Sequence, residues 1–197
     1  MILDLRFSNR PLEDLWCEAV CALVFQRSDM LSGAISGLNR KLAGYLGNLL
    51  ERNLLTGARG ENYLIATTNI FQADKLILHG MGREEELTKT VLKDEITLLG
   101  NSLDKLGLRE IGIHVPVPYG RDKDYCAHLE ISAAFLTDVF YQKHRYEQEL
   151  LLKIIFSVDD RFTDKLDLTI NRLRKHFNPM HKYTIIKDRK SRGGEIS

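Results

Sequence analysis

The chain has 197 residues, of which 44% are hydrophobic and 28% are charged, a composition typical of a globular domain that can bury a full core. Its 28 basic and 27 acidic side chains leave a formal net charge of +1, so the overall charge does not favour binding to nucleic acid or to an anionic membrane. No apolar run approaches the roughly 18 residues of a membrane span. The N-terminus lacks the features of a signal peptide, and three cysteines do not form a disulfide framework, so we expect a cytoplasmic protein.

The first part of the chain predicts strands on either side of one long helix. Alternating apolar and polar residues predict a strand over 2–7, and a continuous apolar run predicts a buried strand over 19–25. Apolar residues spaced at three and four predict a helix over 31–55. Two short strands, 63–67 and 75–79, follow and lead to Gly80-Met81-Gly82.

The rest of the chain alternates regularly between helices and strands. Helices are expected over 84–106, 125–144 and 163–177, and strands over 109–115, 149–158 and, as a small edge strand, 182–187. This order predicts one α/β domain over residues 1–187 with a mixed, mostly parallel sheet covered on both faces, a three-layer α/β/α arrangement. The polar segment 188–197 is typical of a disordered tail.

Three loops that follow predicted strands are candidate binding segments: residues 26–33, 80–84 and 116–122. Ligands of α/β sheets bind in crevices at the carboxyl ends of strands. The strand over 109–115 is apolar enough to be central, so the loop after it is expected to open at such a crevice.

Two stretches resemble the N-terminal domain of leucyl aminopeptidases. They are ALVFQRSDMLSGAISGLNRKLAGYLGNLLERNLLTGARGENYLI and KLILHGMGREEELTKTVL, and the similarity extends over roughly residues 1–178. In that family the catalytic domain follows and holds two metal ions with an Asn-Thr-Asp-Ala-Glu-Gly-Arg-Leu motif. These 197 residues lack the motif. The resemblance therefore implies a non-catalytic domain, and we expect no metal, no cofactor and no peptidase activity from it.

The same domain is similar in fold to macro domains, which bind ADP-ribose. Ser32 and Gly33 lie where macro domains have a glycine-rich run, and Pro118-Tyr119-Gly120 lies where they have a phosphate loop. The Asn-Ala-Ala-Asn segment that fixes the distal ribose is replaced by Gln26-Arg27-Ser28-Asp29, which argues against that ribose contact and against ADP-ribosyl hydrolysis. The resemblance implies a nucleotide or another phosphate-bearing ligand.

Candidate ligand-binding residues come from these loops: Ser32, Gly33, Gly80, Gly82, Pro118, Tyr119, Gly120 and Arg121. Gly80 and Gly82 precede a helix and offer backbone N–H groups to a phosphate, but a tight strand-to-helix turn needs small residues as well, and Glu84-Glu85-Glu86 opposes an anion. Arg121 is suited to pairing with phosphate, although a Pro/Gly turn with a solvated arginine explains the same residues.

Other polar residues favour structural roles. The run from Asp122 to Glu130 contains His128 and Cys126 but no zinc-type spacing, so we interpret it as a solvated helix start. His79 and His114 end two strands and are expected close together, as a polar core pair or as a pocket wall. Two hypotheses remain open. One is a binding module. The other is an interaction module that assembles with itself or with a separate aminopeptidase catalytic chain; nucleic acid is not an expected partner.

Overall fold

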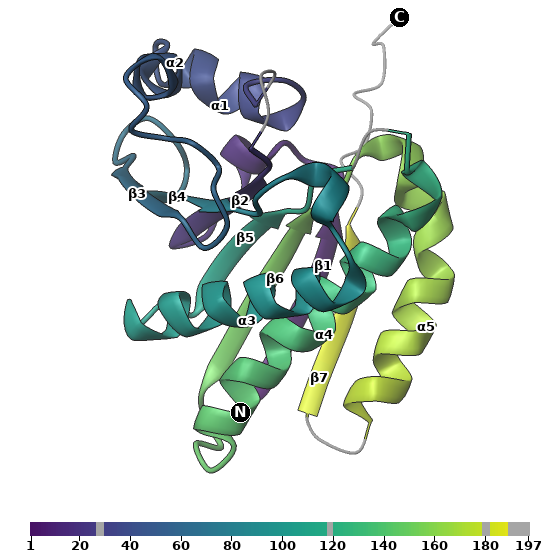
Figure 1. The fold of residues 1–197 in the computed structure, drawn as a ribbon. Coiled ribbons are helices and arrows are strands. Elements are labelled where there is room, and N and C mark those ends of the chain that lie inside the picture. Colours follow the sequence, from purple (N-terminus) through teal and green to yellow (C-terminus); the bar gives the residue numbers. More distant parts are fainter. Residues whose placement is uncertain (27–29, 118–119, 179–181, 189–197) are drawn as a thin grey trace, which may run out of the picture.

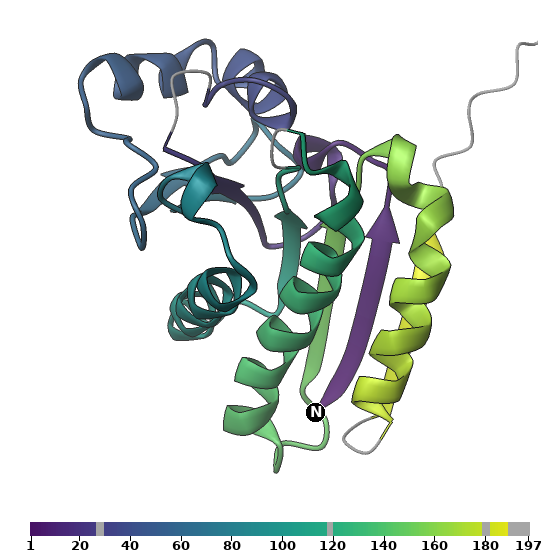
Figure 2. The ribbon, with the colours of Figure 1, turned by 45° about the vertical axis from the view of Figure 1, so that its right-hand side comes forward.

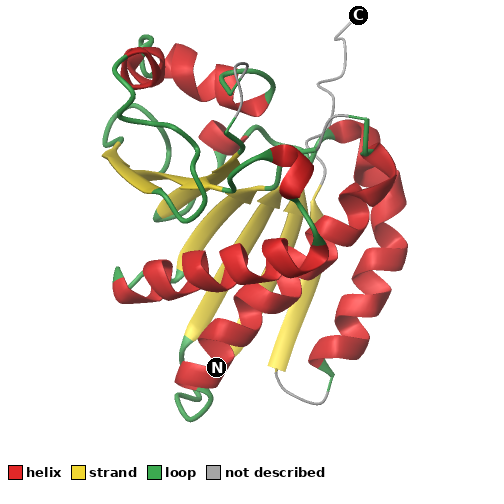
Figure 3. Cartoon of the chain, in the orientation of Figure 1, coloured by secondary structure: helices red, strands yellow, loops and turns green. Residues whose placement is uncertain are grey.

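The computed structural model describes residues 1–26, 30–117, 120–178 and 182–188, which form a seven-stranded sheet with helices (Figures 1 and 3). The strand order is β3-β4-β2-β5-β6-β1-β7, and only β3 runs antiparallel to its neighbour. The strands are β1 (Ile2–Ser8), β2 (Ala19–Val24), β3 (Asn62–Ala66), β4 (Lys75–Gly80), β5 (Glu110–His114), β6 (Leu151–Ser157) and β7 (Lys182–Asp188). This confirms the predicted mixed, mostly parallel sheet, with β5 at its centre and β7 at its edge.

Three long helices cover one face of the sheet (Figures 1 and 2). They are α3 (Lys89–Lys105), α4 (Tyr125–His144) and α5 (Leu166–Phe177). Alternate residues of β1, Leu3, Leu5 and Phe7, point into this layer and are fully buried. The apolar alternation that predicted the strand is therefore the contact surface for these helices.

A smaller layer covers only part of the second face. The 3-10 helix η1 (Leu12–Asp14) and the helices α1 (Ala34–Lys41) and α2 (Tyr45–Glu51) pack against β2, β4 and β3. On the same face of the β1–β6 half, half-buried or exposed charged side chains form ion pairs, Arg6 with Asp4 and Lys153 with Glu110. The predicted three-layer arrangement is thus confirmed over β2 and β4, whereas among the described residues helices cover one face of the β1–β6 half.

The helix predicted over 31–55 is two helices. Ala43 and Gly44 between them adopt positive φ angles of 51° and 83°, a left-handed conformation that ends a helix. The Asn39 side chain accepts a hydrogen bond from the Gly47 N–H at 3.2 Å and supports the new start. Leu42, Leu46 and Leu49 stay buried on both sides of the break, which explains why the apolar spacing alone did not reveal it.

Helix starts also differ from the predicted ones. Thr88 caps α3 by accepting a hydrogen bond from the Val91 N–H at 3.1 Å, so residues 84–86 form a separate 3-10 turn, η2 (Glu84–Glu86). The remaining 3-10 helices are η3 (Asp122–Asp124) and η4 (Asp160–Lys165).

Asp188, the first residue of the predicted tail, belongs to β7, and residues 189–197 lie outside the described part. Within the described residues, no helix is long and apolar enough to cross a membrane.

Candidate functional site

A crevice with two lobes lies at the carboxyl ends of β1, β2, β5 and β6, beside the first turn of α1. The parallel strands point to this end of the sheet in Figure 1. The small lobe has a volume of about 190 Å³. Its lining comes from the end of β2, the segment before α1, the segment after β5 and the start of η4: Leu23, Val24, Phe25, Met30, Ser32, Gly33, Ala34, Ile35, His114, Pro116, Val117, Asp159 and Arg161.

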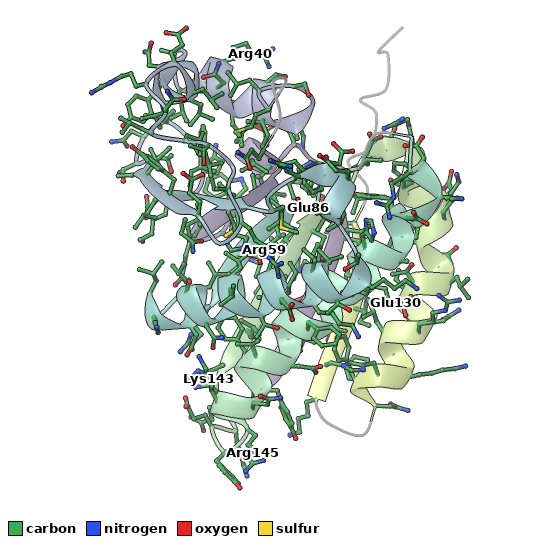
Figure 4. All side chains as sticks on the ribbon, in the orientation of Figure 1. Arg40, Arg59, Glu86, Glu130, Lys143 and Arg145 are labelled. Atoms are coloured by element: carbon green, nitrogen blue, oxygen red, sulfur yellow. The ribbon has the colours of Figure 1, made fainter. Side chains whose placement is uncertain are left out.

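The large lobe has a volume of about 360 Å³ and adds the end of β1, η1 and the exposed side of α1. Both lobes share Gly33, Ala34, His114 and Asp159, so they form one continuous crevice. The polar side chains of the large lobe include Arg10, Glu13 and Arg40. Arg40 extends from α1 in the upper part of the molecule (Figure 4).

The first turn of α1 opens on the crevice. Gly33 precedes the helix with a φ of 60°, a conformation that favours glycine, and nothing lies within 4 Å of the place where its side chain would be. The Ser36 N–H and hydroxyl both donate to the Gly33 carbonyl oxygen, at 3.2 and 2.7 Å. The other first-turn N–H groups and the helix dipole give this wall a partial positive charge.

Arg161 supplies a fixed cation at the same wall. Its guanidinium donates to both carboxylate oxygens of Asp159, at 3.1 and 2.8 Å, and the Arg161 backbone N–H donates to Asp159 Oδ1 at 3.0 Å. The hydrogen bonds from Arg161 hold the pKa of Asp159 below its ordinary value. A second carboxylate, that of Asp122, lies 3.8 Å from Arg161. The arginine is therefore oriented but largely neutralised, and an anionic ligand must share it with Asp159.

His114 lines both lobes, whereas His79 does not belong to the crevice. Loss of hydration lowers the pKa of His114 to about 4, so this imidazole is neutral at pH 7. His79 is fully buried on the other face of the sheet, where Nε2 lies 3.1 Å from Glu95 Oε2 and Nδ1 lies 2.9 Å from Asn62 Oδ1. The expectation that the two histidines lie close together is wrong, because they point to opposite faces: one is a pocket wall and the other a polar core residue.

The predicted site residues do not all lie together in the structure. Ser32 and Gly33 line the small lobe. Gly120 is exposed with a φ of 67°, and Arg121 donates to the Leu87 carbonyl oxygen and to Asp124, each at 3.3 Å, so the arginine fastens its loop to the start of α3. Neither residue is among those that line the two lobes. Pro118 and Tyr119 lie outside the described residues.

The Gly80-Met81-Gly82 turn is built into the backbone around it. The three N–H groups donate to carbonyl oxygens of Glu61, Val24 and Gly57 at 2.8 to 2.9 Å. A side chain at position 80 would collide with the Ala58 carbonyl group. With these donors occupied, the turn offers no N–H cradle in this conformation, which favours the tight-turn interpretation of Gly80 and Gly82.

The crevice contains further residues that were not among those predicted, including the charged residues Arg10, Glu13 and Arg161. They come from the ends of β1 and β6, whereas the loops considered in the sequence follow other strands. The Asp159-Asp160-Arg161 run directly after an apolar strand was the available signal. Among the described residues, no group of three His, Cys, Asp or Glu side chains is placed to hold a metal ion.

The sequence of this chain is similar to the sequences of known aminopeptidases. The profile of the cytosol aminopeptidase family, N-terminal domain, matches residues 22–149. The chain belongs to this family. A probable cytosol aminopeptidase of Nitrosomonas eutropha is 24% identical over 164 residues, which cover 80% of this chain and 33% of the relative. For a similar protein of Halorhodospira halophila the matched share of the relative is 25%, so the chain corresponds to a quarter to a third of these aminopeptidases.

Solved structures support the same fold. A mutant tomato leucine aminopeptidase superposes with a TM-score of 0.64 at 10% identity, covering 85% of this chain and 35% of that one. The Trypanosoma brucei macrodomain in complex with ADP-ribose superposes with a TM-score of 0.56 at 16% identity, covering 84% of this chain and 68% of that one. The domain is therefore macrodomain-like in architecture, as the resemblance implied.

Proposed function

We propose that this aminopeptidase-type N-terminal domain is a binding module for a nucleotide or another small phosphate-bearing ligand. The observation that carries the proposal is the crevice where the α1 N-terminus, Arg161 and Arg10 converge at the ends of parallel strands. Its location is the one that ligands of open α/β sheets use. The macrodomain that superposes on this chain was solved with ADP-ribose, which makes that ligand and its fragments the first to test.

The phosphate is best accommodated in the small lobe, against Gly33 and Arg161. There the first turn of α1 has no side chain in the way, and the Arg161 guanidinium faces the same space. His114 is neutral at pH 7, so it neither attracts nor repels the anion through a net charge. Asp159 and Asp122 weaken the site, so we expect modest affinity, on the order of 10 µM to 1 mM.

Titration calorimetry with ADP-ribose, AMP and inorganic phosphate tests this function. Saturable binding of at least one phosphate compound, weakened in Arg161→Ala, supports the proposal. Arg172→Ala is a matched control, because Arg172 of α5 pairs with Glu130 of α4 and neither residue lines the crevice; Figure 4 labels Glu130. Flat titrations with all three compounds at millimolar concentration would remove the proposal.

A second candidate function, assembly with another chain, is favoured by the edge strand β3. Beside it lies a groove of about 680 Å³ lined by Leu42, Tyr45, Asn62, Tyr63, Leu64, Ile65, Ala66 and Ile70. Leu64 is 52% exposed, and β3 contains no charged residue, whereas the other edge strand, β7, carries Lys182, Lys187 and Asp188. Charged residues commonly prevent edge-to-edge pairing, so β3 is the less protected edge.

Light scattering after size-exclusion chromatography tests assembly of the chain with itself, and a pull-down with a co-expressed aminopeptidase catalytic chain tests the other partner. Leu64→Lys is expected to abolish either complex, while Leu168→Lys, at a leucine of similar exposure on α5, leaves it intact. A monomer that captures no catalytic chain would count against this second function. Cytoplasmic location is part of the proposal, and the cytosol aminopeptidase relatives support it.

A further inference from the structure

Glu13 is a buried acid in the large lobe with no partner. Its exposure is 7%, and among the described residues its carboxylate has neither a hydrogen-bond donor nor an ion-pair partner. The adjacent Asp14 differs, because it pairs with Lys41 at 2.7 Å and is well exposed. Neither carboxylate oxygen of Glu13 is among the fully buried, unsatisfied atoms of the described residues, so the carboxylate opens on the lobe. A ligand group that donates to it would form a charge-assisted hydrogen bond.

The same lobe contains a donor that also lacks a partner. The Arg10 Nε atom is buried and makes no hydrogen bond. Glu13 and Arg10 do not pair with each other within the described residues, although both face the lobe. A carboxylate group on the ligand could accept a hydrogen bond from Arg10 but could not donate one to Glu13. An ammonium group could donate to Glu13 but could not accept from Arg10. A hydroxyl group both donates and accepts, and therefore suits the two together.

The large lobe lies at a distance from the proposed phosphate position that suits the hydroxyl groups of a phosphorylated sugar. Glu13 contacts Gly37, which is four residues beyond Gly33 along α1. Four residues of α-helix rise by roughly 6 Å. This separation is close to that between the phosphate and the ring hydroxyls of a phosphorylated pentose, which are joined by a few single bonds.

We infer that Glu13 is a specificity-determining residue that selects phosphate ligands carrying a sugar diol, with both hydroxyls turned toward the large lobe. The inference rests on the proposed phosphate function of the crevice. It places the selecting contact on η1, not on the segment after β2, where the residues for ribose contact in macro domains are replaced. The Arg10 guanidinium donates to the same hydroxyl oxygens.

Titration calorimetry with AMP and its dideoxy analogue, which lacks both ribose hydroxyls, tests this inference. Wild-type protein is expected to bind AMP about tenfold or more tightly than the analogue, as for hydrogen bonds to a charged group. Glu13→Gln should reduce that preference to about twofold or less. Asp14→Asn, a neighbouring acid outside the lobe, should leave it unchanged.

The outcomes separate the inference from the proposed function. If wild-type protein binds both compounds equally, the diol selection is wrong but the phosphate site stands. If the preference persists in Glu13→Gln, another residue recognises the diol. If neither compound binds, both the inference and the proposed function fail. The comparison of the two ligands on wild-type protein remains decisive even if a Glu13 variant does not fold.

Discussion

The Glu13 carboxylate lies against the backbone of Gly37, in the space that a side chain at position 37 would occupy. Gly37→Ala therefore forces the carboxylate away from α1. The carboxylate is the end of a flexible side chain and can move aside, so we expect a stability change of less than about 1 kcal/mol together with a loss of ligand preference in the large lobe. Thermal unfolding together with calorimetry measures both effects.

Gly47→Ala is the matched control for that substitution. Gly47 lies in α2, and an added methyl group there meets only Leu31 and Asn39 at ordinary contact distances of 3.7 and 3.9 Å. Alanine is a better helix former than glycine, so this variant should be more stable by about 0.5–1 kcal/mol. If Gly37→Ala were equally stabilising, the contact with Glu13 would not constrain α1.

Arg161 and Arg121 are expected to respond differently to substitution by alanine. Arg161→Ala removes the cation in the small lobe and should weaken phosphate binding by about 1–3 kcal/mol, with little change in melting temperature. Arg121→Ala removes the hydrogen bond to the Leu87 carbonyl oxygen and should lower the melting temperature slightly while affinity stays within about twofold. Calorimetry that shows the opposite order would place the phosphate on the loop after β5.

Gly80→Ala tests the structural interpretation of the Gly80-Met81-Gly82 turn. The new methyl group collides with the Ala58 carbonyl group, which is backbone and cannot rotate away. We expect a destabilisation of about 2–4 kcal/mol, measurable by denaturant unfolding. Gly120→Ala, where no atom lies within 4 Å, should cost only the strain of a positive φ, about 1 kcal/mol. A mild effect at position 80 would contradict the tight packing of the turn.

His144 gives stability a defined dependence on pH. Burial lowers its pKa, but hydrogen bonds to the carboxylates of Glu147 and Asp104, both at 2.6 Å, outweigh that effect and raise it. A raised pKa means that the folded state binds the proton more tightly than the unfolded state. The stabilisation is complete below about pH 6.5, the ordinary histidine pKa, and is lost as pH rises through the higher folded-state pKa.

His144→Gln should therefore lower the melting temperature more at pH 5.5 than at pH 9. A difference of about 0.5–1 kcal/mol, or roughly 1–4 °C, is the expected size for a partly exposed pair. Lys143 also pairs with Asp104, at 3.1 Å, and remains in the variant (Figure 4). His176→Gln, at the more exposed pair with Asp138, is the control. An equal loss at both pH values would show that His144 acts by packing alone.

The sequence predicts the elements of this fold better than it predicts the site. Apolar spacing identified each strand and α4 closely, because burial on one or both faces dictates those residues. It failed at Ala43 and Gly44, where the helix breaks without interrupting the apolar stripe. It also missed Glu13 and Arg161, since their positions in the crevice depend on the order β2-β5-β6-β1, which no local pattern encodes.

The place of β1 in the sheet also governs how the chain folds. β1 lies between β6 and β7, and Ile2 pairs with Leu151 and with Lys182. Its partners are therefore synthesised on the order of ten seconds after it, at typical translation rates. Until then, a strand bearing Leu3, Leu5 and Phe7 has no sheet to join, and closing so long a loop is slow. We therefore expect insertion of β1 to be a late step of folding and the interval before it to be a period of exposure to aggregation.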